Sequence, residues 1–175
     1  MQKNMEVEES AMPETRMEIE RKFLIDRPDP AWLAAWPGSR EAEIVQIYLT
    51  AQPGEEVRVR QWSEGGRSLY YHTTKRSVSA VSREEIERIV TPEEYEAFLS
   101  QADPAKVPLH KKRWLLPYRG QLLEIDLYPF WQDQAILEIE LDAEDTPIDL
   151  PPQIKVRKEV TDDESYKNAA LADRR

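Results

Sequence analysis

The stretch Met17-Glu18-Ile19-Glu20-Arg21-Lys22-Phe23-Leu24-Ile25 alternates charged and apolar side chains over most of its length. In a β-strand, successive side chains point to opposite faces, so residues two apart share a face. Glu18, Glu20 and Lys22 therefore lie on one face of a predicted strand. The opposite face is mainly apolar and carries Met17, Ile19, Phe23 and Ile25.

The same two-residue period recurs along the chain, as where Arg58 and Arg60 alternate with valines. Glycines at Gly65-Gly66 and Gly120 supply the turns that antiparallel hairpins require. The pattern predicts eight strands, near residues 17–25, 44–50, 56–62, 67–76, 83–89, 108–117, 121–129 and 135–142.

Three segments predict helix starts. Asp29-Pro30 precedes the run AWLAAW, which has a packing face. Thr91-Pro92-Glu93-Glu94 and Thr161-Asp162-Asp163-Glu164 have the spacing of capping boxes, with Thr as the N-cap. Tyr166 and Asn168 are expected to dock the last helix onto the sheet.

The length of 175 residues fits one ordinary domain. Residues 1–16 are acidic, rich in Met and without apolar periodicity. This composition predicts a disordered tail or a segment added for expression. Residues 17–175 are then expected to form a single domain.

The charged strand faces allow two interpretations. They could be the solvated face of an open antiparallel sheet, which is the ordinary origin of such alternation. However, like charges recur within strands, and on an open surface this repulsion brings no gain. An outer-membrane barrel is disfavoured because Arg21 and Arg88 would face lipid. The sequence therefore predicts an α+β fold: an eight-stranded antiparallel closed β-barrel with a charged interior and helices packed outside.

The interior charges are segregated by strand, which indicates two kinds of ligand. Clustered Arg and Lys suit a polyanion, because guanidinium groups match phosphate oxygens. Clustered carboxylates suit Mg²⁺ or Mn²⁺ rather than zinc. The cations are Lys22, Arg58, Arg60, Lys75, Arg83, Lys111 and Arg113. The carboxylates are Glu18, Glu20, Glu85, Glu87, Glu124, Asp126, Glu138 and Glu140.

Composition excludes several other function classes. The net charge of -10 argues against a broad nucleic-acid surface. The absence of cysteine removes disulfides and thiolate chemistry, and the two histidines have no metal-ligand spacing. No apolar run approaches the roughly 20 residues that a membrane helix needs. We therefore expect a soluble, cytoplasmic protein with neither a nucleic-acid nor a membrane partner.

The segment Glu18-Ile19-Glu20-Arg21-Lys22 resembles the E-x-E-x-K signature that opens the CYTH superfamily, the triphosphate tunnel metalloenzymes. Further elements agree in order, and the resemblance covers about residues 17–172. These elements are Tyr48-Leu49-Thr50, Arg58-x-Arg60, Thr73-x-Lys75, Arg83-x-Glu85-x-Glu87, Lys111-x-Arg113, Glu124-x-Asp126, Glu138-x-Glu140 and Tyr166-Lys167-Asn168.

The chain most resembles the short bacterial inorganic triphosphatases, which implies an eight-stranded tunnel and metal-dependent hydrolysis of inorganic triphosphate or a small organic triphosphate. The resemblance also implies that Lys75 and Tyr48 form a catalytic dyad. Lys75 is a reasonable base because neighbouring cations would favour loss of its proton. Phosphate would be bound by the remaining cations, Lys22, Arg58, Arg60, Arg83, Lys111 and Arg113. The metal would be held by members of the carboxylate set.

Two alternatives remain at this level. The superfamily includes class IV adenylate cyclases, although no base-recognition pocket is evident in the sequence. A non-catalytic module that binds polyphosphate or nucleotide would carry the same charges. The partner is a triphosphate-containing small molecule in each case, and a homodimer is not excluded.

Overall fold

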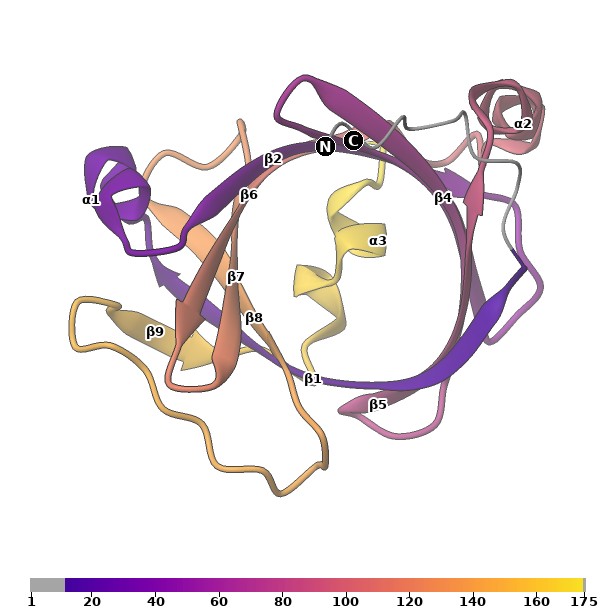
Figure 1. The fold of residues 1–175 in the computed structure, drawn as a ribbon. Coiled ribbons are helices and arrows are strands. Elements are labelled where there is room, and N and C mark those ends of the chain that lie inside the picture. The colour runs from indigo at the N-terminus through magenta and orange to yellow at the C-terminus, as the bar shows by residue number, and fades with distance from the viewer. Residues whose placement is uncertain (1–11, 175) are drawn as a thin grey trace.

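A computed structural model describes residues 12–174 and consists of a ring of antiparallel strands with short helices around it (Figure 1). The strands of the ring follow the predicted segments closely. They are β1 (Glu14–Asp26), β2 (Arg40–Leu49), β3 (Glu55–Glu64), β4 (Arg67–Ser77), β5 (Ser82–Val90), β6 (Leu109–Tyr118), β7 (Gln121–Leu127) and β8 (Gln134–Glu140).

The ring closes through β1, which pairs with two strands. Residues 14–19 of β1 pair with β5, and residues 20–26 pair with β8. The remaining order is β5-β4-β3-β2-β6-β7-β8, so every strand of the ring has two neighbours. The predicted closed, eight-stranded antiparallel barrel is therefore confirmed.

A short strand, β9 (Val156–Glu159), was not predicted. It pairs with residues 23–25 of β1, next to the segment that pairs with β5. Its side chains are exposed, so it lacks the alternation from which the other strands were predicted.

The predicted tail requires a correction. Residues 1–11 lie outside the described residues, but Glu14, Thr15 and Arg16 belong to β1. These residues are paired with β5 through backbone contacts that the local sequence does not reveal. The strand therefore begins three residues before the predicted start at residue 17.

Two helices lie outside the ring, as expected, on opposite sides of it (Figure 1). The first, α1 (Pro30–Ala35), is capped by Asp29, whose side chain accepts a hydrogen bond from the backbone of Ala31. The second, α2 (Pro92–Phe98), is followed by the 3₁₀ turn η1 (Leu99–Gln101) and has the predicted capping box of Thr91 and Glu94.

The third predicted helix differs from expectation in start and place. Thr161 does not cap it, because its hydroxyl accepts from the backbone N–H of Lys22 on β1 at 3.1 Å. Asp163 instead caps the 3₁₀ turn η2 (Glu164–Tyr166), and α3 (Asn168–Leu171) follows. Figure 1 shows α3 across one end of the ring rather than outside it.

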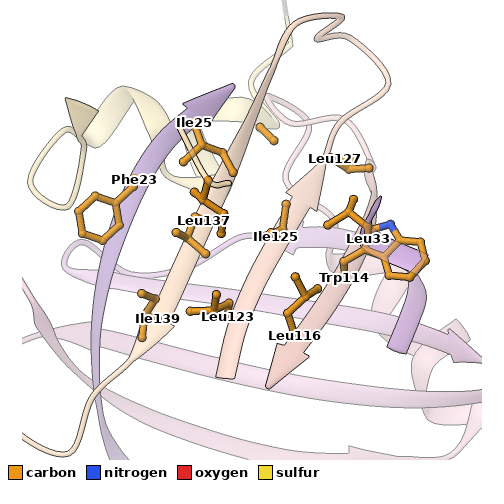
Figure 2. Close-up of a cluster of buried hydrophobic side chains, with 12 residues drawn as sticks. Phe23, Ile25, Leu33, Trp114, Leu116, Leu123, Ile125, Leu127, Leu137 and Ile139 are labelled. Carbon is orange, nitrogen blue, oxygen red and sulfur yellow. The ribbon is translucent and has the colours of Figure 1, made fainter. Parts of the chain in front are cut away.

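Three apolar clusters hold these elements together. The largest covers the outer face of β1, β6, β7 and β8, with Leu33 of α1 packed against it (Figure 2). A second lies between the β2–β5 wall and α2, which contributes Tyr95. The third lies at the α3 end of the ring, where Leu24, Tyr48, Leu109 and their neighbours pack against α3.

The outer cluster predicts a large stability loss from truncation. Leu137 is completely buried, so Leu137→Ala should lower the free energy of unfolding by about 2–5 kcal/mol. Leu122, which is 44% exposed, provides the control, and Leu122→Ala should cost far less. Urea denaturation measures both. Equal losses in the two variants would contradict this account of the core.

Candidate active site

The barrel encloses a charged cavity of about 250 Å³. Strand parity explains its character, because closure turns inward the charged face of every ring strand except β2, which contributes Gln46. The lining residues are Arg16, Glu18, Glu20, Gln46, Arg58, Arg60, Trp62, Lys75, Arg83, Glu85, Glu87, Lys111, Arg113, Glu124, Glu138, Glu140 and Asn168.

Most of the predicted site residues are thus brought together, and three lie behind the lining. Lys22 contacts Glu138 of the wall at 3.3 Å, and Asp126 is completely buried. Tyr48 is also buried, and its hydroxyl accepts a hydrogen bond from Gln46 at 3.0 Å.

On one wall, cations of β4 and β5 surround a carboxylate of β1. The Lys75 ammonium contacts Glu18 at 2.9 Å and Glu85 at 3.4 Å. Arg83 contacts Glu18 at 3.1 Å. Burial opposes ionisation of Glu18, but the attraction of Lys75 and Arg83 holds its pKa below the usual range. Glu18 therefore remains an anion inside the barrel.

On the facing wall, Asp126 of β7 pairs with two cations of β6. Lys111 contacts it at 2.8 Å, and the Arg113 guanidinium binds its two oxygens at 2.7 and 2.8 Å. Arg113 also contacts Glu124 at 2.8 Å and Glu138 at 3.2 Å. Charges that are segregated along the sequence are therefore paired across neighbouring strands.

The carboxylates of β1, β7 and β8 crowd together. Glu124 is directly opposite Glu138, and Glu20 is opposite Glu140. Burial and the charges of Glu138 and Glu18 raise the pKa of Glu20 to about 7. Burial, against the attraction of Arg113, raises the pKa of Glu124 to about 7. This side of the cavity therefore holds more negative charge than its own cations neutralise.

The donor chemistry of this acidic side fits a hard divalent cation. Its donors are carboxylate oxygens, among them Glu138 Oε1, which accepts no hydrogen bond and lies 3.3 Å from the Lys22 ammonium. Within residues 12–174, no group of three or more acidic or histidine side chains is already arranged around one metal position. An ion held here would therefore take further ligands from water or from a bound anion, as Mg²⁺ commonly does.

The arginines of β3 form the opposite kind of site. Arg58 is 6% exposed, and the Nε atoms of Arg58 and Arg60 are buried without hydrogen-bond acceptors. Burial and the charge of Arg58 lower the pKa of Arg60. Arg60 also contacts Glu87 at 3.6 Å, so the unpaired donors of this pair are the two Nε–H groups, which can bind an anion.

No hydrogen bond joins Lys75 to Tyr48 among the described residues. Lys75 contacts carboxylates, whereas the Tyr48 hydroxyl is engaged by Gln46. Burial, with the charge of Glu56, raises the pKa of Tyr48 above its ordinary value. Tyr48 therefore carries its proton at neutral pH, and the catalytic dyad remains a prediction.

Sequence reasoning missed several residues of the cavity. Arg16 contacts Glu85 at 2.9 Å and Glu140 at 3.2 Å, and its parity with Glu18 was the available signal. Gln46 lies two residues before Tyr48, on the same strand face. Asn168 was expected only to dock the last helix. It also lines the cavity and accepts a hydrogen bond from Lys111 at 3.4 Å.

In the part of the chain that the structure describes, no helix has the length and apolar character needed to cross a membrane.

Comparison with known proteins identifies the family. An inorganic triphosphatase from Nitrosomonas europaea is 31% identical over 156 residues, which cover 89% of this chain and 96% of that protein. The crystal structure of an inorganic triphosphatase matches with a TM-score of 0.54 at 28% identity, covering 89% of this chain and 93% of that chain. A conserved hypothetical protein from Pyrococcus furiosus shares the fold, with a TM-score of 0.55 at 21% identity over 73% of this chain and 81% of that chain. A model of the CYTH domain matches residues 16–167, and this protein therefore belongs to the CYTH domain family.

Proposed function

We propose that this protein hydrolyses inorganic triphosphate, or a small organic triphosphate, inside the barrel with the help of Mg²⁺ or Mn²⁺. The proposal rests mainly on Arg58 and Arg60, whose Nε donors are unpaired. Both line a cavity whose other side is rich in carboxylates. The similarity to an inorganic triphosphatase along most of both chains supports the same substrate class.

The cations of β3 and β6 would bind the phosphate chain. Arg58 and Arg60 offer free donors, and Lys111 and Arg113 line the adjoining wall. Arg83 and Lys22 add positive charge toward the α3 end. Fixed cations stabilise the charge that develops on phosphate oxygens during transfer, without reorganisation of the protein.

The carboxylates Glu20, Glu138 and Glu140 would hold the metal, with phosphate oxygens as further ligands. Such an ion, when bound, would neutralise negative charge on the phosphates. Glu138 also contacts Arg113, and Glu140 contacts Arg16. Of the remaining predicted ligands, Glu18, Glu85, Glu124 and Asp126 contact cations, and Glu87 accepts from Thr73 at 2.7 Å. These five would chiefly orient the phosphate-binding side chains.

Lys75 is our candidate base. Its ammonium lies 2.9 Å from Glu18 and 3.4 Å from Glu85. A general base must be neutral to accept a proton, and lysine in general is neutral only at high pH. An alkaline optimum is therefore expected.

A phosphate-release panel tests the function. Inorganic triphosphate, ATP, thiamine triphosphate, pyrophosphate and long polyphosphate would each be incubated with Mg²⁺, Mn²⁺ or EDTA. Release from a triphosphate that EDTA abolishes is expected. Formation of cyclic AMP would instead indicate a cyclase, and metal-dependent binding without turnover would indicate a binding module.

Removal of one arginine should weaken both substrate binding and turnover. For Arg58→Ala we expect a raised KM and a lowered kcat, together about ten- to a hundred-fold in kcat/KM, because a charge-assisted hydrogen bond is lost. Arg21, which pairs with Glu159 outside the barrel, provides the matched control. Steady-state kinetics measures both. Equal kinetics for Arg58→Ala and Arg21→Ala would contradict a phosphate-binding role for Arg58.

The crowded carboxylates should make the metal-free protein less stable as pH rises. The folded-state pKa values of Glu20 and Glu124 are raised to about 7, so their stabilising contribution is complete below about 4.5 and is lost as pH rises through 7. Glu20→Gln and Glu124→Gln mimic the protonated acids. In EDTA, each should be more stable than wild type at pH 7.5, by on the order of 1–3 kcal/mol, and not at pH 4. Urea denaturation at both pH values measures this, and a difference that does not change with pH would contradict it.

Substitution of the candidate base separates two roles for Lys75. Lys75→Arg keeps the positive charge, but arginine does not lose its proton in proteins. If Lys75 is the base, kcat should fall by roughly 10²–10⁴-fold and the alkaline limb of the pH–kcat profile should change. A variant with near wild-type kcat would leave Lys75 only a phosphate-binding role. Tyr48→Phe should cause a smaller loss.

A further inference from the structure

A buried glutamine of the cavity wall has an amide oxygen without a hydrogen-bond partner. Gln46 is completely buried and lines the cavity wall. Its Nε2 donates to the Tyr48 hydroxyl, and its Oε1 is buried without a hydrogen-bond partner. A buried acceptor without a partner destabilises the structure that contains it. The geometry therefore calls for a group that donates a hydrogen bond to this oxygen.

The surroundings of Gln46 restrict what that donor can be. In the strand register, Gln46 lies opposite Arg60 on β3 and opposite Leu109 on β6, two residues from Lys111. Both of these cations belong to the phosphate site proposed above. Ionised phosphate oxygens only accept hydrogen bonds, so a bound phosphate chain cannot satisfy Gln46 Oε1. Lys111 is engaged by Asp126 and Asn168. A water molecule beside the phosphate chain meets the requirement.

We propose that Gln46 positions the attacking water, an inference that rests on the triphosphatase function proposed above. Gln46 Oε1 would accept one O–H of the water, while the hydrogen bond from Nε2 to the Tyr48 hydroxyl holds the other end of the amide. Tyr48 then serves as a positioning residue. Its raised pKa agrees with this role, since a protonated, buried hydroxyl anchors a neighbour rather than taking a proton.

In this step the Gln46 amide neither gains nor loses a proton. The water oxygen forms a bond to the terminal phosphorus, and the bridging P–O bond breaks. The electron pair of that bond leaves with pyrophosphate when the substrate is inorganic triphosphate. The O–H that Gln46 holds remains on the released phosphate, and the other proton passes to the proposed base, Lys75.

This arrangement predicts a preference for water over an alcohol. Water has two O–H groups, one for Gln46 and one for the base, whereas methanol has only one. Wild-type protein should therefore form little methyl phosphate in dilute methanol. Gln46→Met keeps the side-chain length but removes the acceptor, so the ratio of methyl phosphate to phosphate should rise several-fold. The kcat should fall about ten- to a hundred-fold, and KM should stay within about twofold.

Matched variants complete the test, with ³¹P NMR of the products and steady-state kinetics as readouts. Gln46→Glu keeps an acceptor oxygen and should retain the preference for water, although its charge should raise KM. Gln61 lies on β3 with its amide directed to Ser68, and Gln61→Met should behave as wild type. Thermal unfolding confirms that each variant folds.

The outcomes are distinct. A raised methyl phosphate ratio with lowered kcat in Gln46→Met supports the proposal. An unchanged ratio, or an effect on KM alone, overturns it while the triphosphatase function stands. Absence of phosphate release by the wild-type protein overturns the function, and this inference with it.

Discussion

Closure of the ring by β1 is the constraint on which the rest of the structure depends. One edge of β1 pairs first with β5, while the other edge pairs with β8 over the second half of the strand. This pairing turns the charged faces of seven strands, and the uncharged inner face of β2, into a common interior. Without it, the same faces would be solvated and the arginines of β3 would be hydrated rather than held with free donors.

Enclosing so many charges is costly unless each has a partner, because desolvation of an ion inside a protein costs several kcal/mol. The barrel meets this requirement by placing acidic strands beside basic ones. Glu18 forms ion pairs with Lys75 and Arg83, and Asp126 forms ion pairs with Lys111 and Arg113. These pairs fix the side chains before any substrate arrives, which is the condition for electrostatic catalysis. Arg58 and Arg60 on one side keep unpaired Nε donors, and the carboxylates of β1 and β8 crowd on another, so the two sides are suited to an anion and a cation.

At the α3 end of the barrel, the inward faces of several strands become apolar. Beyond the charged residues, Leu24, Leu109 and Tyr48 continue the inward faces of their strands and pack beneath α3. This cluster separates part of the cavity from solvent at that end. Tyr48 lies where the apolar cluster meets the polar wall, and it anchors Gln46 there. Burial thus gives the neutral residues of the wall a fixed orientation, as the ion pairs do for the charged ones.

The sequence by itself determined the strands, their inward faces and most of the site. A period of two is a local property, so Glu18, Arg58 and Glu138 could be assigned to charged faces without knowledge of their neighbours. Recurring like charges indicated closure for a physical reason, their repulsion on an open sheet. The capping box at Thr91 was equally local, and the structure confirms it.

Only the tertiary structure decided which charges meet. The ion pairs of Arg16 and Lys75 depend on strand register, which joins residues tens of positions apart. Thr161 had the local signal of a helix cap, but its hydroxyl binds β1, and α3 consequently begins later and covers one end of the barrel. Gln46 had no charge to mark it. Its importance arises from burial beside Tyr48 with one oxygen unpaired, and burial is set by contacts between strands rather than by the order of residues along one strand.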